Sequence, residues 1–301
     1  MDGIIAVWKP AGWTSHDVVA KVRRLLRMKR IGHSGTLDPM VTGVLPLCLG
    51  RATRVVEYLQ ERPKAYEAVI QLGISTDTED LTGTVLEERG GITITEEEVL
   101  RVLRSFVGEI EQVPPMFSAV KVDGKRLYEL AREGKTVERK SRKVTIHQIE
   151  LQSIDNSTDK PTFAFSVVCS KGTYIRTLCV DIGKALGVPA AMAQLTRTMS
   201  GGITKEQCLT LEQIEQLQQD GEIEKFILPA EAAISHLEPV QLNERLSEMA
   251  LRGQKIPFAM LDADLTESRN PIRVYNEKKS FIGIFEADSE LAVLKPVKVF
   301  S

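Results

Sequence analysis

One glycine-rich stretch, residues 32–54, constrains this chain more than any other part of it. Its sequence is GHSGTLDPMVTGVLPLCLGRATR, and its four glycines permit close backbone approach and positive φ. A single carboxylate, Asp38, lies in this stretch, and Pro39 disfavours the α conformation there, holding Asp38 extended or in a turn. The apolar run at 44–49 is expected to be buried. The stretch therefore predicts either an acid mounted on a constrained loop against the core, or a simple Asp-Pro turn.

Several short motifs agree with one another in pointing to a single family. The stretch around Asp38 resembles the active-site motif of the TruB family of tRNA pseudouridine synthases. The resemblance extends to a Lys-Pro motif, a tyrosine-bearing strand, an arginine motif and a further short element, which are WKP at 8–10, KAYEA at 64–68, SKGTYIRTL at 170–178 and LTR at 195–197. The order and separations of these motifs also fit, so the resemblance covers nearly the whole chain.

The resemblance implies an isomerase that converts uridine to pseudouridine in the T loop of tRNA, at position 55. Asp38 would be the catalytic nucleophile or base, and whether it attacks C1′ or C6 or acts as a base on the sugar stays open. Tyr66 would offer an aromatic face to the flipped base and help to remove the C5 proton. Arg176 would pair with Asp38 and orient it. From the residues alone, Tyr66 is equally a core aromatic, and Arg176 is either solvated or paired with an unidentified partner, since a cation is poorly placed at a helix N-terminus.

Four further residues are implied to contact the substrate. Tyr174 and the backbone near Leu195 would line the pocket, and Lys9 would shape its floor. His33 would enter the RNA where nucleotides have flipped out. Without the resemblance, His33 is better interpreted as a turn histidine with a local hydrogen bond.

Composition narrows the class of protein and the cofactors it could use. No apolar run is long enough to span a membrane, and the N-terminus lacks a basic region followed by an apolar stretch, so a cytoplasmic protein is expected. The four cysteines form no CxxC pair and the four histidines show no ligand spacing, so no metal site is predicted. The sequence has no GxGxxG after a strand and no GxxxxGK[ST], and pseudouridine formation requires no cofactor.

Positive charge is concentrated although the formal net charge is only −2. Residues 21–30 carry six basic side chains and no acid, and residues 121–143 carry nine basic against four acidic ones. A near-neutral chain can therefore present a basic face to RNA. The alternative is that these runs are solvated helix surfaces.

Hydrophobic periodicity predicts the main elements around the motifs. Residues 64–73 and 162–170 alternate in polarity as strands do. Ser15 is predicted to cap a helix, and a second helix after residue 172 is predicted to end at Gly187. Strands and helices follow one another without regular alternation, which favours an α+β fold with a mixed, mostly antiparallel sheet.

Two domains are predicted. Residues 1–236 would form a pseudouridine-synthase-like catalytic domain, with a basic insertion at about 113–143 that the resemblance implies grips RNA. Residues 237–301 contain short strands and would form a small C-terminal domain. The resemblance implies that this domain is a PUA-like RNA-binding β-barrel.

The expected partner is tRNA, bound through its T arm, with no guide RNA and no membrane, and the protein is expected to be a monomer. A non-catalytic RNA-binding or RNA-folding protein would use the same basic surfaces, but Asp38 would then be dispensable. A guide-RNA-dependent synthase subunit would share the motif, although the short segment before Trp8 and the compact C-terminus favour the stand-alone form. A glycosidase normally needs two catalytic carboxylates, and only Asp38 stands out.

Overall fold

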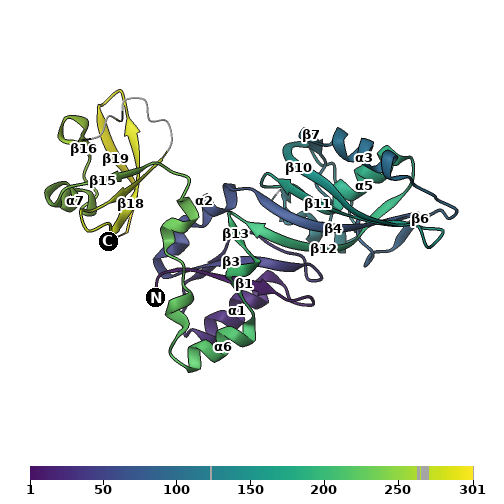
Figure 1. Ribbon diagram of the computed structural model, residues 1–301, viewed down its shortest axis with the longest axis horizontal. Helices are drawn as coiled ribbons and strands as arrows, with labels where there is room; N and C mark the ends of the chain where they lie inside the picture. The colour runs from purple at the N-terminus through teal and green to yellow at the C-terminus, as the bar shows by residue number, and fades with distance from the viewer. Residues whose placement is uncertain (123, 263–264, 266–270, 301) are drawn as a thin grey trace.

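The computed structural model describes the whole chain except residues 123, 263–264, 266–270 and 301. Within the described part, one ten-stranded sheet forms the main body, and a separate five-stranded sheet lies near the C-terminus. Figure 1 shows an elongated molecule in which the C-terminal strands form a lobe at one end. Of the helices described, none combines the length and apolar character needed to cross a membrane.

The large sheet is mixed, as the sequence predicts. Its strands follow the order β14 (Cys208–Leu209), β1 (Gly3–Lys9), β3 (Thr42–Leu49), β12 (Ala190–Ser200), β4 (Lys64–Leu72), β11 (Thr162–Cys169), β10 (Arg142–Asp155) and β7 (Gly108–Gln112). Two short strands pair outside this path, β2 (Ile31–His33) with β3 and β13 (Ile203–Thr204) with β12. The pairs β1–β14 and β3–β12 are parallel, and the others are antiparallel. The predicted α+β class with a mostly antiparallel sheet is confirmed.

One half of this sheet packs against two helices, α3 (Glu96–Ser105) and α5 (Ile175–Leu186). Alternate residues of β11, including Phe163 and Phe165, are buried in the core that these helices cover. This is the two-residue period expected of a strand with one buried face. Helix α5 ends at Gly187, whose left-handed conformation (φ 75°) closes the last turn. The strand and the helix end predicted here are confirmed.

The other half, around β1 and β3, is covered on both faces. Helices α1 (Ser15–Leu25) and α6 (Leu211–Gln219) pack on one face. The short helices η1 (Gly50–Val55), α2 (Val56–Glu61) and η4 (Ala230–Ile234) contribute to the core on the other face. Single turns of 3₁₀ helix, η2 (Lys205–Gln207) and η3 (Ile223–Phe226), lie before and after α6.

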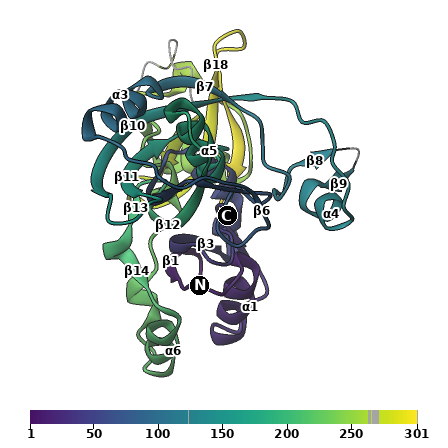
Figure 2. The same cartoon turned by 90° about the vertical axis from the view of Figure 1, so that its right-hand side faces the viewer.

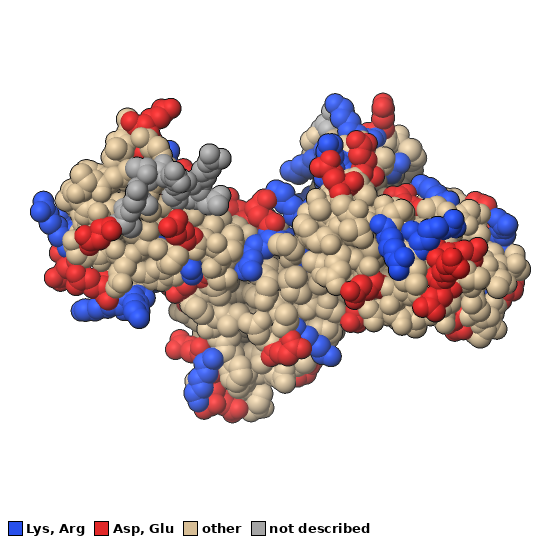
Figure 3. All heavy atoms as spheres, turned by 45° about the horizontal axis from the view of Figure 1, so that its top comes forward, with Lys and Arg blue, Asp and Glu red and all other residues tan. Residues whose placement is uncertain are grey.

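A segment between β7 and β10 leaves the sheet and projects to the side, as Figure 2 shows for β8 (Lys121–Val122), β9 (Lys125–Arg126) and α4 (Leu127–Arg132). Part of its positive charge is neutralised locally, because Lys125 and Lys135 both pair with Glu133. On the face shown in Figure 3, basic side chains form clusters separated by acidic groups rather than one continuous basic surface. A second excursion is the hairpin of β5 (Ile74–Thr76) and β6 (Val85–Glu88).

The C-terminal lobe is a curled, PUA-like sheet with a core of its own. It contains β15 (Pro239–Gln241), β17 (Ile272–Tyr275), β18 (Phe281–Asp288), β19 (Val293–Val299) and β16 (Ile256–Pro257), with α7 (Glu244–Leu251) and η5 (Phe258–Met260). It contacts the main body where the Arg54 guanidinium lies 5.4 Å from the ring centre of Phe300. Lys298 also donates to the Arg54 carbonyl at 2.6 Å. The domain boundary between residues 236 and 237 stays a prediction.

The parallel pairing of β3 with β12 depends on Gly43. Gly43 lies opposite Arg197 with φ at 119°, and an added Cβ would lie 2.2 Å from the Arg197 carbonyl oxygen. We expect Gly43→Ala to lower the free energy of unfolding by about 3 kcal/mol, because both the backbone strain and the steric clash must be absorbed.

The matched control is Gly91→Ala. Gly91 also has positive φ, at 68°, but its Cβ would meet nothing within 4 Å. We expect that variant to lose about 1 kcal/mol from backbone strain alone. Urea unfolding of both variants provides the measurement, and equal losses would show that close strand approach is not the constraint at Gly43.

Candidate active site

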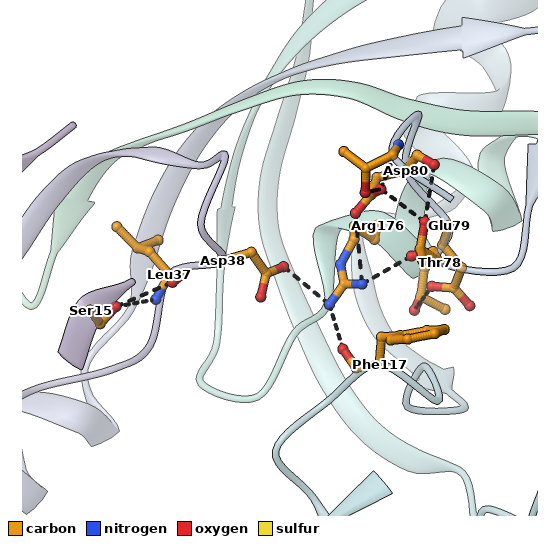
Figure 4. Close-up of polar contacts among 10 residues, drawn as sticks. Ser15, Leu37, Asp38, Thr78, Glu79, Asp80, Phe117 and Arg176 are labelled. Carbon is orange, nitrogen blue, oxygen red and sulfur yellow. Dashed lines mark hydrogen bonds and ion pairs between the residues drawn. The ribbon is translucent and has the colours of Figure 1, made fainter. Parts of the chain in front are cut away.

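The loop between β2 and β3 presents Asp38 and is anchored from two sides. The Ser15 hydroxyl accepts from the Leu37 amide at 2.8 Å and lies 3.2 Å from the Leu37 carbonyl, and both residues are buried. On the other side, the Lys9 ammonium donates to the Pro39 carbonyl at 3.0 Å. Asp38 is therefore held between two fixed neighbours, and Figure 4 shows its carboxylate directed away from Leu37 toward an arginine.

That arginine is Arg176, in the first turn of α5, whose side chain is buried. Its Nη2 lies 3.1 Å from Asp38 Oδ2 and donates to the Phe117 carbonyl at 2.8 Å. Its Nη1 donates to the Thr78 carbonyl at 2.9 Å and lies 3.9 Å from Asp80 Oδ2. Figure 4 shows the guanidinium between these groups. One side chain thus joins the Asp38 loop, the β5–β6 hairpin, the projecting segment and α5, and the open alternative of a solvated Arg176 is wrong.

A cavity of about 490 Å³ opens beside this ion pair. It is lined by five of the residues predicted from sequence, which are Asp38, Tyr66, Tyr174, Arg176 and Leu195. Asp38 is 44 % exposed in its side chain, so one carboxylate oxygen remains available to a ligand in the cavity. The residues that the sequence motifs group are therefore adjacent in space, although they come from two strands, the Asp38 loop and the start of α5.

A wider cavity of about 1030 Å³ meets Asp38 from the side of the projecting segment. Its wall includes His33 together with basic and aromatic side chains of that segment, which are Lys121, Arg126, Tyr128 and Arg132. The guanidinium groups of Arg126 and Arg132 lie 5.8 and 5.6 Å from the ring centre of Tyr128. This combination of cations and an aromatic ring suits phosphates and bases.

His33 ends strand β2 and is partly buried. Its Nδ1 accepts from the Gly35 amide at 3.3 Å, which is the local hydrogen bond that the bare sequence suggested. Burial lowers the pKa of the imidazole, so the neutral form is favoured near neutral pH. His33 lines the wider cavity and is not among the residues that line the cavity beside Tyr66.

The sequence analysis missed a buried cation behind Tyr66. Arg197 is 1 % exposed, and it donates to the carbonyls of Val44 at 2.8 Å and Gly35 at 3.2 Å. Arg197 lies opposite Tyr66 in the sheet. Burial raises the pKa of the Tyr66 hydroxyl and keeps it protonated, while the charge of Arg197 opposes that shift. The LTR motif could have placed Arg197 at the cavity. Leu195 and Arg197 lie two residues apart, and a strand places both side chains on one face.

Comparisons with known proteins agree with this geometry. The profile described as TruB family pseudouridylate synthase (N terminal domain) matches residues 23–175. The chain belongs to the TruB family of pseudouridylate synthases. A second profile, described as the tRNA pseudouridylate synthase B C-terminal domain, matches residues 176–235. This TruB protein is accordingly an isomerase of the pseudouridine synthase class.

Individual relatives show how far the TruB likeness extends. The chain is 47 % identical over 301 residues to tRNA pseudouridine synthase B of Bacillus licheniformis, covering 99 % of this chain and 97 % of the relative. It is 43 % identical over 291 residues to that of Clostridium perfringens, covering 96 % of each. Among solved structures, the chain in a Cbf5–Nop10–Gar1 complex aligns with a TM-score of 0.76 at 29 % identity, covering 99 % of this chain and 85 % of that one.

Because of Lys9, the folding stability of this TruB protein is expected to change with pH in the alkaline range. The side chain is fully buried, and burial lowers the pKa of its ammonium to about 8 from its ordinary 10.5. Below about pH 8 the ammonium is charged in both the folded and the unfolded chain. Between pH 8 and 10.5 only the unfolded chain binds this proton, so folding stability rises with pH.

We therefore expect the unaltered protein to gain about 2 kcal/mol of unfolding free energy relative to Lys9→Met between pH 8 and pH 10. Other groups that titrate in this range are common to both proteins and cancel in the comparison. Urea unfolding at the two pH values provides the measurement. Parallel pH dependences of the two proteins would show that the Lys9 ammonium does not carry this pKa.

Proposed function

We propose that this TruB enzyme converts uridine to pseudouridine at position 55 in the T loop of tRNA, acting alone and without a guide RNA. The observation that carries the proposal is the carboxylate of Asp38, fixed 3.1 Å from the buried Arg176 guanidinium at a cavity lined by Tyr66. The relatives that match at 43–47 % identity are named tRNA pseudouridine synthase B.

The reaction requires one anchored nucleophile or base. The bond from ribose C1′ to uracil N1 breaks, the base turns, and C5 bonds to C1′. C5 then loses its proton and N1 gains one, so the product is an isomer of the substrate. No electrons are gained or lost overall, so the chain's own groups suffice. Asp38 would begin the reaction, either by attacking the nucleotide or by removing a proton from it. Arg176 would hold the Asp38 carboxylate in one orientation.

The cavity offers the detached uracil a fixed surface on which to turn. Tyr66 would stack against the base, with its hydroxyl kept protonated by burial and Arg197 opposite it in the sheet. Tyr174 and Leu195 would form the remaining walls. A bound base would displace water from the cavity, which would favour return of the base to C1′ over hydrolysis.

RNA would approach from the wider cavity. A uridine inside a folded loop must leave its stack to reach Asp38, and His33 lies where it could fill the space that the flipped nucleotide vacates. The basic residues of the projecting segment, within about 113–143, would contact phosphates. Residues 1–236 would thus hold the chemistry, and the PUA-like residues 237–301 would add affinity for RNA.

A guide-RNA-dependent activity is the second candidate, because solved relatives include a Cbf5–Nop10–Gar1 complex and an H/ACA RNP bound to a substrate RNA. Those chains are 27–29 % identical to this one, whereas the relatives named as tRNA pseudouridine synthases exceed 40 %. Tritium release from C5-labelled uridine in a tRNA transcript, with purified protein and no other RNA, decides between the two. Tritium release from the transcript without an added guide RNA supports the stand-alone activity.

We expect Asp38→Asn to lower kcat by about three orders of magnitude or more while RNA affinity stays within about twofold. Asparagine keeps the shape and the turn-forming hydrogen bonds but removes the charge. Single-turnover tritium release and filter binding provide the measurements. Asp77→Asn is the matched control, because Asp77 accepts from the Thr84 amide in an exposed turn. Equal, near-parental rates for both variants would reduce Asp38 to a turn former.

We also expect the modification to map to the T-loop uridine of a whole tRNA, and an isolated T-arm stem-loop to be a substrate. Proteins that read RNA sequence prefer loops whose bases can be splayed out. Carbodiimide treatment followed by primer extension locates the pseudouridine. A signal confined to the anticodon arm would contradict the assignment of the substrate.

A further inference from the structure

A third carboxylate, that of Glu79, lies close to Arg176 and has no part in the reaction described above. Figure 4 shows Glu79 with Thr78 and Asp80 on the side of the guanidinium away from Asp38. The backbone of Glu79 is left-handed, with φ at 65°, a conformation that a residue with a side chain adopts only at a cost. Such strain persists where the surroundings fix the residue, so the contacts of Glu79 are of interest.

The Glu79 side chain is bonded to helix α5. Its Oε2 accepts a hydrogen bond from the Thr177 hydroxyl at 2.6 Å, and Thr177 is 5 % exposed. Burial raises the pKa of the Glu79 carboxyl, whereas the hydrogen bond from Thr177 and the charge of Arg176 lower it. Thr177 directly follows Arg176 in the chain. The bond therefore joins the β5–β6 hairpin to α5 beside the arginine that pairs with Asp38.

Residues 76–80, here called the Glu79 turn, are stiffened by hydrogen bonds of their own. The Glu79 amide donates to the Thr76 carbonyl at 3.3 Å. The Thr76 hydroxyl donates to the Asp80 carbonyl at 2.6 Å, and the Thr78 hydroxyl donates to an Asp80 carboxylate oxygen at 2.8 Å. Because these bonds tie the Glu79 turn together, a contact made by one of its residues also positions the others.

The Glu79 turn is fastened to β12 and to α5. The Met192 amide of β12 donates to the Glu79 carbonyl at 3.0 Å. On the side of α5, Arg176 Nη1 donates to the Thr78 carbonyl at 2.9 Å, and the Thr177 hydroxyl donates to the Glu79 carboxylate. The Thr177 bond therefore holds the Glu79 turn against α5 independently of the guanidinium.

We propose that Glu79 is a positioning residue, whose bond to Thr177 keeps the Arg176 guanidinium directed at the reacting carboxylate. Without that bond, Arg176 could follow the Glu79 turn toward the Asp80 carboxylate, which already lies 3.9 Å away, and leave Asp38. A misplacement of about 1 Å at a reacting group can cost about 100-fold in rate. This inference rests on the proposed function, because it concerns the carboxylate that would act in that reaction.

Two substitutions at Glu79 separate its hydrogen bond from its charge. Glu79→Ala removes the bond and keeps the backbone strain, since alanine is no freer than glutamate at positive φ. Glu79→Gln removes the charge but keeps an oxygen that can accept from Thr177. We expect Glu79→Ala to lower the single-turnover rate constant about tenfold with RNA affinity within about twofold, and Glu79→Gln to restore the rate to within about twofold.

Single-turnover tritium release and filter binding provide these measurements, on variants shown to be folded by urea unfolding. A residue that only stabilises the fold would lower the free energy of unfolding and leave the rate of the folded protein unchanged. Rescue by glutamine and the separation of rate from affinity therefore distinguish positioning from stability.

Thr177→Val breaks the same bond from the side of the helix, and it tests the inference even where Glu79→Ala does not fold. We expect a loss of about tenfold from each substitution and no further loss when the two are combined, because both remove one interaction. Glu98→Ala is the matched control. Glu98 accepts from the Thr95 hydroxyl at 2.7 Å at the start of α3, and we expect this variant to keep the parental rate.

A parental rate for Glu79→Ala, equal losses for the alanine and glutamine variants, or additive losses with Thr177→Val would each show that the inference is wrong. If the unaltered protein releases no tritium from a tRNA transcript, the proposed function is wrong. The crystal structure of Glu79→Ala then decides whether Glu79 positions Arg176. A distance from Arg176 Nη2 to Asp38 Oδ2 longer than the present 3.1 Å supports this role, and an unchanged distance contradicts it.

Discussion

The contacts of one buried guanidinium bring the parts of the candidate active site together. Arg176 is 6 % exposed, and a buried cation is tolerated only when it is paired and its donors are satisfied. Its partners are the Asp38 carboxylate and the carbonyls of Thr78 and Phe117, which come from three segments far apart in sequence. Removing any one of these segments would leave a charge or donor unsatisfied, so the Asp38 loop, the β5–β6 hairpin and the projecting segment are energetically linked through α5.

The same principle extends to the rest of the loop that carries Asp38. A run rich in glycine and proline makes few ladder hydrogen bonds, yet its buried carbonyls still need donors. Long cationic side chains supply several of them: Lys9 bonds the Pro39 carbonyl and Arg197 bonds that of Gly35. Because these donors come from β1 and β12, the loop takes its position from the large sheet. The rigidity of the loop is thus a property of the sheet, which suits the proposed reaction, in which one carboxylate stays in a fixed place.

Local patterning predicted the elements that have a strong period or a clear end. The alternating strand β11 and the end of α5 at Gly187 follow from side-chain periodicity and from the ease of positive φ at glycine. Ser15 was predicted as the helix cap, but Thr14 caps α1 and Ser15 holds Leu37 instead. Strand β12 was not predicted, because it is rich in alanine, contains two register shifts and lies between partners on both edges. Strand pairing, not intrinsic propensity, makes it a strand.

The sequence by itself determined the identity of the nucleophile candidate and its closest partners, because Asp38, Tyr66 and Arg176 lie in motifs whose residue types already suit the chemistry. It also determined the mixed α+β class through the order of its apolar runs. Only the tertiary structure decided that Arg197 lies opposite Tyr66 in the sheet, that Asp80 and Thr78 share Arg176, and that Met40 and Leu81 form a groove beside Asp38. The physical reason is that such contacts join segments many residues apart. Strand register and the burial of charge specify these contacts, and no local sequence pattern expresses either of them.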